Sequence, residues 1–294
     1  MRRSMLFLPG NTPNMLINGH YLGADAVIFD LEDAVSPSEK DAARILVRNA
    51  LRVLDRNGVE SIVRINSVDT SYWQQDIATI LPESPDLLLL PKASTPQDVL
   101  AVDAYMTQIE ESIDVEQGTI GLMLLIETAL GVENAYAVAS CCDRVKALFL
   151  GEADLTADLQ CKRTKDGAEI AYARARLVVA ARAAGIDVYD TPFTDVNDDE
   201  GISVDAARAK AYGFTGKAAI SPRHIEAINT TFSPSQEEID YAYDVVEAIR
   251  VAKEQGKGAI ALRGKMIDAP IVARAQRTIA MAEALGMDWR RQDE

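Results

Sequence analysis

Eight short apolar runs divide the first 222 residues of this chain, and most of the stretches between them are long enough for a helix. They are SMLFLPG (4–10), DAVIFDLED (25–33), ESIVRIN (60–66), DLLLLPK (86–92), TIGLMLLIET (119–128), VKALFLGEADL (145–155), IDVYDTPF (186–193) and GKAAISP (216–222). The apolar residues are continuous rather than alternating, which is typical of strands buried on both faces of a parallel sheet. Eight strand–helix units in fewer than 300 residues predict a (β/α)8 TIM barrel.

The second fold that this pattern allows is an open, doubly wound sheet. It is disfavoured because no glycine-rich dinucleotide fingerprint follows any of the apolar runs. Helix starts are marked by Ser36-Pro37-Ser38-Glu39, which predicts a capping box, and by Thr95-Pro96. Gly185 is the expected stop of an alanine- and arginine-rich helix over 171–185.

The residues after the eighth run exceed what a barrel needs. We expect a catalytic barrel over 1–232 and a C-terminal helical extension over 233–294. The extension reads as a helix over about 234–255, a glycine-bracketed segment over 256–268 and a second helix over about 269–286. Surplus elements of this kind are expected to pack on the barrel and on a neighbouring subunit.

Composition excludes several classes of protein. The formal net charge is -15, so the surface repels phosphate backbones and nucleic-acid binding is not expected. Three cysteines, two of them adjacent, do not form a disulfide framework, and a reduced, cytoplasmic setting is expected. No segment approaches the roughly 20 apolar residues of a membrane span.

Charged residues gather where the predicted strands end. In a barrel these ends share one face, and active sites lie there. The ends carry, in chain order, Asp30, Glu32 and Asp33; Arg64 and Asn66; Lys92; Glu127; Glu152 and Asp154; Asp190; and Ser221. So many carboxylates in one place are costly without a compensating cation, and Mg²⁺ is the natural one.

Glu127 and Asp154 are the best pair of magnesium ligands, because both follow buried runs on adjacent strands. Arg64 and Lys92 would orient an anionic substrate, and Arg64 can grip a carboxylate with two hydrogen bonds. Lys92 is equally well explained as a charged cap at a strand end. His224 is expected to be structural.

At these residues the sequence resembles a known family. RRSMLFLPGN, FDLEDAV, VRIN, LPK, IETALG, GFTGKAAISPRHI and GKMIDAP occur in this order from Arg2 to about Leu285. Together they are similar to the HpcH/HpaI aldolase and citrate lyase family. That family contains the citrate lyase beta subunit and the malyl-, methylmalyl- and citramalyl-CoA lyases.

The resemblance implies a TIM barrel that forms a homotrimer or a hexamer, with Mg²⁺ as cofactor. It implies that Glu127 and Asp154 bind the metal and that Arg64 and Glu127 bind substrate. Arg64 would also act in catalysis, with Glu32 and Asp33 holding Arg64 or a water of the metal. Asp268 is similar to an acid/base that relatives contribute from a neighbouring subunit.

The implied reaction is cleavage of a carbon–carbon bond in a 3-hydroxyacyl thioester of the citryl type, on CoA or an acyl carrier protein. It gives an acetyl thioester and an oxo acid such as oxaloacetate. A malyl- or citramalyl-CoA lyase, a pyruvate-class aldolase and a non-catalytic subunit beside alpha and carrier subunits are the alternatives. The sequence departs from the family at Gly151-Glu152-Ala153-Asp154, where the acidic neighbour of Asp154 has moved one place, so a role for Glu152 is in doubt.

Overall fold

The computed structural model describes residues 1–254 and 260–289, which separate into two compact units. The first spans Arg2–Asn229, and the second comprises the described residues from Thr230 onward. The boundary lies inside helix α10 (Ile225–Phe232), and the predicted division into a catalytic barrel and an extension stays a prediction. Among the described helices, none is long and apolar enough to cross a membrane.

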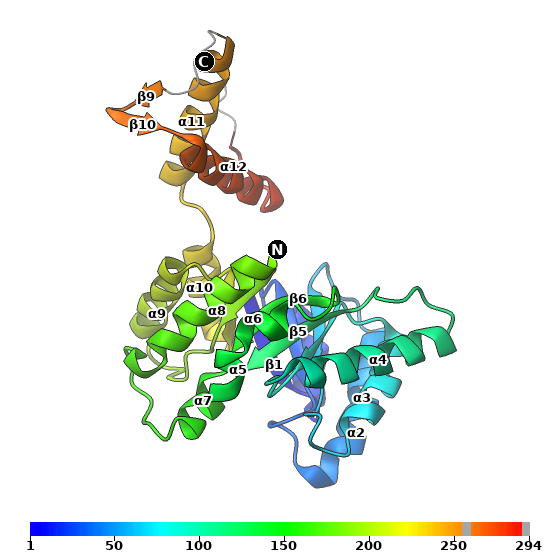
Figure 1. Ribbon diagram of the computed structural model, residues 1–294. Helices are drawn as coiled ribbons and strands as arrows, with labels where there is room; N and C mark the ends of the chain where they lie inside the picture. The colour runs from blue at the N-terminus through cyan, green and yellow to red at the C-terminus, as the bar shows by residue number, and fades with distance from the viewer. Residues whose placement is uncertain (255–259, 290–294) are drawn as a thin grey trace. The chain divides into compact units, whose positions relative to one another are not determined.

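The first unit is a closed barrel of eight parallel strands, each paired with the next and β8 paired with β1 (Figure 1). All eight predicted strands are present in the predicted order, so the TIM barrel is confirmed. They are β1 (Ser4–Pro9), β2 (Ala26–Asp30), β3 (Glu60–Arg64), β4 (Leu87–Leu90), β5 (Gly121–Ile126), β6 (Val145–Leu150), β7 (Asp187–Asp190) and β8 (Gly216–Ala219).

Helices follow the strands and cover the outside of the barrel (Figure 1). They are α1 (Pro13–Asn18), α2 (Lys40–Val53), α3 (Trp73–Ile80), α4 (Pro96–Ser112), α5 (Ala129–Glu133), α6 (Ala135–Ala139), α7 (Glu152–Asp158), α8 (Ala171–Ala184), α9 (Asp199–Tyr212) and α10. Short 3-10 turns accompany them: η1 (Gly19–Tyr21), η2 (Pro37–Glu39), η3 (Leu81–Glu83), η4 (Ala168–Ile170) and η5 (Pro222–His224).

Helix capping agrees with the sequence at two sites and differs at one. Thr95 and Asp98 form a complete capping box at the start of α4, and Gly185 ends α8 in the left-handed conformation. The box predicted at Ser36 does not form, because Ser36 precedes η2 and makes no side-chain cap. Its hydroxyl lies instead 3.5 Å from the Glu39 carboxylate, and α2 begins one residue later.

Inward-facing side chains of the strands fill the barrel. The buried interior cluster is Met5, Ala26, Ile28, Ile62, Leu87, Leu89, Met123, Leu125, Ala147, Phe149, Tyr189 and Ala218. Side chains that point into the barrel lie two positions apart along each strand. Counting on from these interior residues therefore shows which residues at the strand ends point into the mouth of the barrel.

The second unit consists of two helices and a hairpin. Helix α11 (Gln236–Glu254) packs with α12 (Ala269–Ala284), and β9 (Ile260–Leu262) pairs with β10 (Lys265–Ile267) antiparallel. The predicted glycine-bracketed segment therefore contains a hairpin, although its first residues, 256–259, lie outside the described part of the chain. Packing of this unit on a neighbouring subunit stays a prediction.

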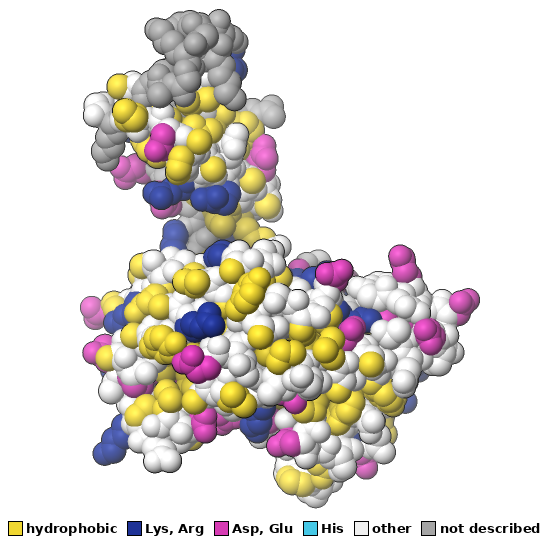
Figure 2. Space-filling model, viewed as in Figure 1, with side chains coloured by type: hydrophobic (Ala, Val, Ile, Leu, Met, Phe, Trp, Pro, Cys, Tyr) yellow, Lys and Arg dark blue, Asp and Glu magenta, His cyan; other side chains and the backbone are white. Residues whose placement is uncertain are grey.

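Exposed apolar side chains gather on one outer face of the barrel. Figure 2 shows hydrophobic side chains over α5, α6 and α8. The large exposed ones on these helices are Leu130, Tyr136, Tyr172 and Val179.

Candidate active site

An arginine and an aspartate face each other at the mouth of the barrel. Ile28 and Ile62 point into the barrel, so Asp30 and Arg64, two positions further along β2 and β3, point the same way. They are also register partners in the sheet. Arg64 Nε and Nη2 donate to the two Asp30 oxygens at 2.7 and 2.5 Å, which fixes the plane of the guanidinium.

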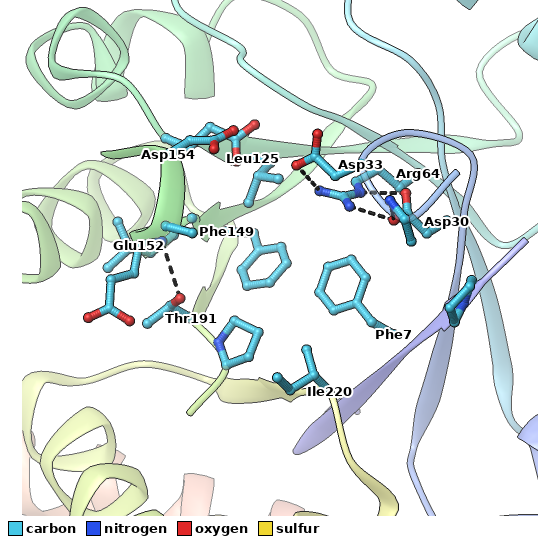
Figure 3. A pocket seen from close by; sticks show the side chains of 17 residues that line it. Phe7, Asp30, Asp33, Arg64, Leu125, Phe149, Glu152, Asp154, Thr191 and Ile220 are labelled. Atoms are coloured by element: carbon cyan, nitrogen blue, oxygen red, sulfur yellow. Dashed lines mark hydrogen bonds and ion pairs between the residues drawn. The ribbon is translucent and has the colours of Figure 1, made fainter. Parts of the chain in front are cut away.

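Arg64 is held on its other sides as well. Its Nη1 lies 3.1 Å from Glu32 Oε2 and 3.7 Å from Asp33 Oδ2, and its guanidinium carbon lies 5.2 Å from the Phe7 ring centre. Burial disfavours the charged form, but the Asp30 carboxylate outweighs it and raises the pKa of Arg64 above its ordinary value. Arg64 is therefore a permanent, immobile cation at the edge of the cavity (Figure 3).

Glu127 follows β5 and is 4% exposed. The backbone N–H of Lys92 donates to its Oε1 at 2.9 Å. Burial, opposed by the charge of Arg64 and helped by that of Asp154, raises the pKa of Glu127 to about 8. A carboxylate in this environment is stabilised in its ionised form by an added positive charge.

Asp154 lies in the first turn of α7, and its Oδ2 is buried without a hydrogen-bond partner. Lys92 Nζ forms an ion pair with this oxygen at 3.9 Å and donates to Glu32 Oε1 at 3.0 Å. Lys92 also has a left-handed backbone, with φ of 53°. A buried carboxylate oxygen that accepts no hydrogen bond, in a residue that lines a polar cavity, is where a metal ligand is expected.

The cavity at this mouth has a volume of about 430 Å³, with one polar and one apolar side. Figure 3 shows Asp33, Arg64 and Asp154 along one side, with Phe7, Phe149 and Ile220 facing them. The rings of Phe7 and Phe149 stack at 5.9 Å between centroids. The site therefore offers charged groups to one end of a ligand and an apolar floor to the rest.

A magnesium ion fits the polar side. Asp30, Glu32, Asp33, Glu127 and Asp154 bring five carboxylates, against the two cations Arg64 and Lys92. No group of three or more His, Cys, Asp or Glu is arranged for a metal within residues 1–254 and 260–289. Two carboxylates, with water and substrate completing the coordination, is the arrangement that Mg²⁺ favours.

Five of the six predicted site residues lie together here: Glu32, Asp33, Arg64, Glu127 and Asp154. Asp268 lies in the other compact unit, exposed at the start of α12, where its Oδ1 accepts the Ile271 N–H at 3.2 Å. The roles assigned to all six stay predictions.

Two strand-end residues expected at the mouth are not there. Asp190 points outward from β7, is fully buried and pairs with Arg174 and Lys217. At the end of β8, Ile220 rather than Ser221 lines the cavity. In both strands, the side chain that points into the mouth belongs to the residue next to the one predicted from the sequence.

Glu152 is on the cavity wall, but its carboxylate forms an ion pair with Arg163. Figure 3 shows this carboxylate directed away from Phe7 and Phe149.

Asp30 and Thr191 are the residues that sequence reasoning did not assign. In the sequence, Asp30 is one of several acids at a strand end and has no assigned role. Its pairing with Arg64 could have been predicted, because the two residues end adjacent strands and lie opposite each other in the sheet. Thr191 gave no signal, since a lone threonine after a strand is typical of a turn.

Comparisons with known proteins agree with this geometry. The family model described as HpcH/HpaI aldolase/citrate lyase matches residues 3–222. The citrate lyase subunit beta of Leuconostoc mesenteroides subsp. cremoris is 42% identical over 97% of this chain and 94% of its own. The human mitochondrial citramalyl-CoA lyase is 31% identical over 97% of this chain and 86% of its own.

A crystal structure of the protein CitE from Mycobacterium tuberculosis, in complex with magnesium, acetoacetate and coenzyme A, has the same fold. It aligns with a TM-score of 0.78 and 28% identity over 96% of this chain and 98% of that one. This chain belongs to the HpcH/HpaI aldolase/citrate lyase family of carbon–carbon lyases.

Proposed function

We propose that this protein is a magnesium-dependent carbon–carbon lyase that cleaves a 3-hydroxyacyl thioester of the citryl type. The products are an acetyl thioester and an oxo acid such as oxaloacetate. One observation carries the proposal: the buried Glu127 and Asp154, whose Oδ2 is buried and accepts no hydrogen bond, lie at a cavity that is also lined by the fixed cation Arg64. The similarity to a citrate lyase beta subunit over nearly the whole chain supports the choice of substrate.

Glu127 and Asp154 would hold Mg²⁺. When bound, the metal supplies a Lewis acid that polarises the hydroxyl and the nascent carbonyl of the substrate. Both carboxylates follow buried strands, so their positions are set before substrate arrives. That rigidity reduces the reorganisation needed during the reaction.

Arg64 would bind the substrate's carboxylate or thioester carbonyl. The substrate hydroxyl would give its proton to solvent water at the cavity mouth, and its oxygen would become the carbonyl of the oxo acid. The bond between the two carbons would break, and its electron pair would move into the thioester as an enolate. The Arg64 guanidinium stabilises the negative charge that develops there, because Asp30 keeps it oriented toward the cavity. Glu32 and Asp33 restrict its third nitrogen.

Asp268 would return a proton to the enolate carbon and so complete the acetyl thioester. Its Oδ1 caps α12, which holds the carboxyl group in place and leaves Oδ2 for the transfer. We propose that a neighbouring copy of the chain supplies this residue. The exposed apolar side chains over α5, α6 and α8 support self-association as a homotrimer or hexamer.

The acyl carrier would be CoA or an acyl carrier protein. The relative from Mycobacterium tuberculosis is in complex with coenzyme A, which supports a CoA ester. A carrier protein, with separate alpha and carrier subunits, is the assembly expected of a citrate lyase beta subunit. Cleavage of free CoA esters by the purified chain distinguishes the two.

Citramalyl-CoA is the second candidate substrate. Among the cavity-lining residues of the described chain, Arg64 supplies the cation, and Phe7, Phe149 and Ile220 form an apolar floor. That floor suits the methyl group of a citramalyl thioester, which releases pyruvate, at least as well as the second carboxymethyl group of a citryl thioester. The similarity to human citramalyl-CoA lyase supports the same alternative.

The test is a panel of citryl-, malyl- and citramalyl-CoA, assayed with Mg²⁺ and then with EDTA. The proposal expects metal-dependent release of one oxo acid, which names the substrate. Glu127→Gln and Asp154→Asn are expected to abolish turnover. Release that continues undiminished in EDTA would contradict the proposal, and activity only with an added carrier protein would identify a lyase subunit.

A further inference from the structure

Helix α7, which carries Asp154, begins without a cap of its own. Its N-cap residue is Gly151, which has no side chain to accept a hydrogen bond. The first N–H groups of a helix have no partner within the helix. Here the Glu152 N–H donates to Thr191 Oγ1 at 3.2 Å, from the loop that follows β7 (Figure 3). Thr191 therefore caps α7 from the loop that follows β7.

Thr191 is itself held by a fully buried lysine. Lys217 Nζ, on β8, donates to the Thr191 carbonyl oxygen at 2.6 Å. The same nitrogen lies 2.8 Å from Asp190 Oδ2 and 2.5 Å from Asp205 Oδ2. Three oxygens thus fix the ammonium group, and the ammonium group fixes the backbone at Thr191.

Arg174 completes a quartet of buried charges. It donates to both oxygens of Asp190, at 3.0 and 2.9 Å, and to Asp205 at 3.0 Å. Arg174, Asp190, Asp205 and Lys217 are each 5% exposed or less. Two positive and two negative charges balance, and they join β7 and β8 to α8 and α9.

Such a quartet is weak support for stability alone, because burying charges costs desolvation that apolar residues would avoid. Its geometric consequence is specific. Asp190 and Lys217 are register partners in the sheet, so the quartet sets where β7 ends and the next residue, Thr191, turns into the cavity. From there one hydrogen bond reaches the first turn of α7.

We propose that Thr191 is a positioning residue for Asp154, held in place by the buried quartet. The connection runs from Lys217 to the Thr191 carbonyl, from the Thr191 hydroxyl to the Glu152 N–H, and from there to Asp154 two residues along the helix. This inference rests on the proposed function, since it gives Asp154 the role of metal ligand.

The experiment measures Mg²⁺ affinity by calorimetry on the full chain without substrate, together with melting temperature. Thr191→Val keeps the shape and removes the hydroxyl; Thr191→Ser keeps the hydroxyl. Thr95→Val is the matched control, because Thr95 caps α4 by accepting the Asp98 N–H and does not line the cavity.

We expect Thr191→Val to weaken Mg²⁺ binding about 10–100-fold, as loss of a group supporting a metal ligand usually does. Thr191→Ser is expected to restore binding to within about 3-fold of the wild type, since it restores the cap. Loss of one cap is expected to lower the melting temperature by about 2–4 °C in both valine variants. Only Thr191→Val should then change Mg²⁺ affinity.

Wild-type affinity in Thr191→Val, or equal losses in the serine and valine variants, would overturn the positioning role. Thr191→Ala provides the same test if the valine methyl group prevents folding. Failure of the proposed function looks different: wild type and Asp154→Asn would then bind Mg²⁺ equally well, or not at all.

Discussion

Adding one methyl group at Gly151 should displace the Glu127 carboxylate. A Cβ at this position would lie 2.6 Å from Glu127 Oε2 and 2.7 Å from Glu127 Cβ. The second distance is about 0.8 Å shorter than the roughly 3.5 Å at which carbon atoms begin to attract. The backbone at Gly151 has φ of -103° and ψ of 101°, which alanine adopts freely, so the effect is a side-chain clash and not backbone strain.

The expected cost has two separable parts. Overpacking of this kind lowers the free energy of unfolding by about 1–3 kcal/mol, which corresponds to about 3–9 °C in melting temperature. Displacing the Glu127 carboxylate should weaken Mg²⁺ binding by about 10–100-fold. Calorimetric titration with Mg²⁺ and thermal unfolding of Gly151→Ala measure the two parts independently.

Gly19→Ala is the control for crowding alone. Its Cβ would meet the terminal methyl Cδ1 of Leu8, and the three nearest atoms to it are all on apolar side chains. We expect it to lower the melting temperature without changing Mg²⁺ affinity. If Gly151→Ala binds Mg²⁺ as tightly as the wild type, Glu127 is not held against Gly151 in the metal-binding state and the reasoning is refuted.

Three further predictions concern other residues. Asp30→Asn removes one of the two oxygens that accept hydrogen bonds from the buried Arg64. The free energy of unfolding measured in urea should therefore fall by about 2–4 kcal/mol, and kcat should fall as well. Unchanged stability and kcat would contradict this prediction. Burial lowers the pKa of His20 and His224. Below about pH 6.5 these histidines therefore bind protons in the unfolded chain but not in the folded chain, so the folded state loses stability as the pH falls. Urea midpoints at pH 7.5 and 5.5, compared with a variant in which both are glutamine, isolate this loss from that of the other titrating groups; an identical pH dependence in both proteins would show the idea to be wrong. Asp268→Asn should fold and bind Mg²⁺ normally and lose turnover, whereas a fully active variant would remove Asp268 from the mechanism.

The barrel could be predicted because strands buried on both faces leave continuous apolar runs, and turn and cap residues mark their ends. That five of the predicted site residues lie together at one mouth could be predicted because barrel topology brings strand ends to one face, while their roles stay predictions. An apolar run without alternation does not show which of its side chains point into the barrel, so the orientation of the residues at each strand end could not be predicted. Asp190 was therefore expected at the mouth, whereas its neighbour Thr191 is the residue that lines it.

The buried quartet could not be predicted for a related reason. Arg174 and Asp205 lie on helices, and their partners Asp190 and Lys217 lie on strands. Nothing in the local sequence distinguishes these four from solvent-exposed charges. Their pairing depends on how helices α8 and α9 rotate against the sheet, which is set by packing.

The central claim is that Glu127 and Asp154 hold a divalent cation. Mn²⁺ is a suitable stand-in for Mg²⁺, because it favours the same oxygen ligands and scatters X-rays anomalously. A crystal grown with Mn²⁺ and oxaloacetate should show one anomalous peak bonded to an oxygen of each of these carboxylates, and the peak should disappear in Asp154→Asn. A peak elsewhere, or one that remains unchanged in the Asp154→Asn crystal, would contradict the account.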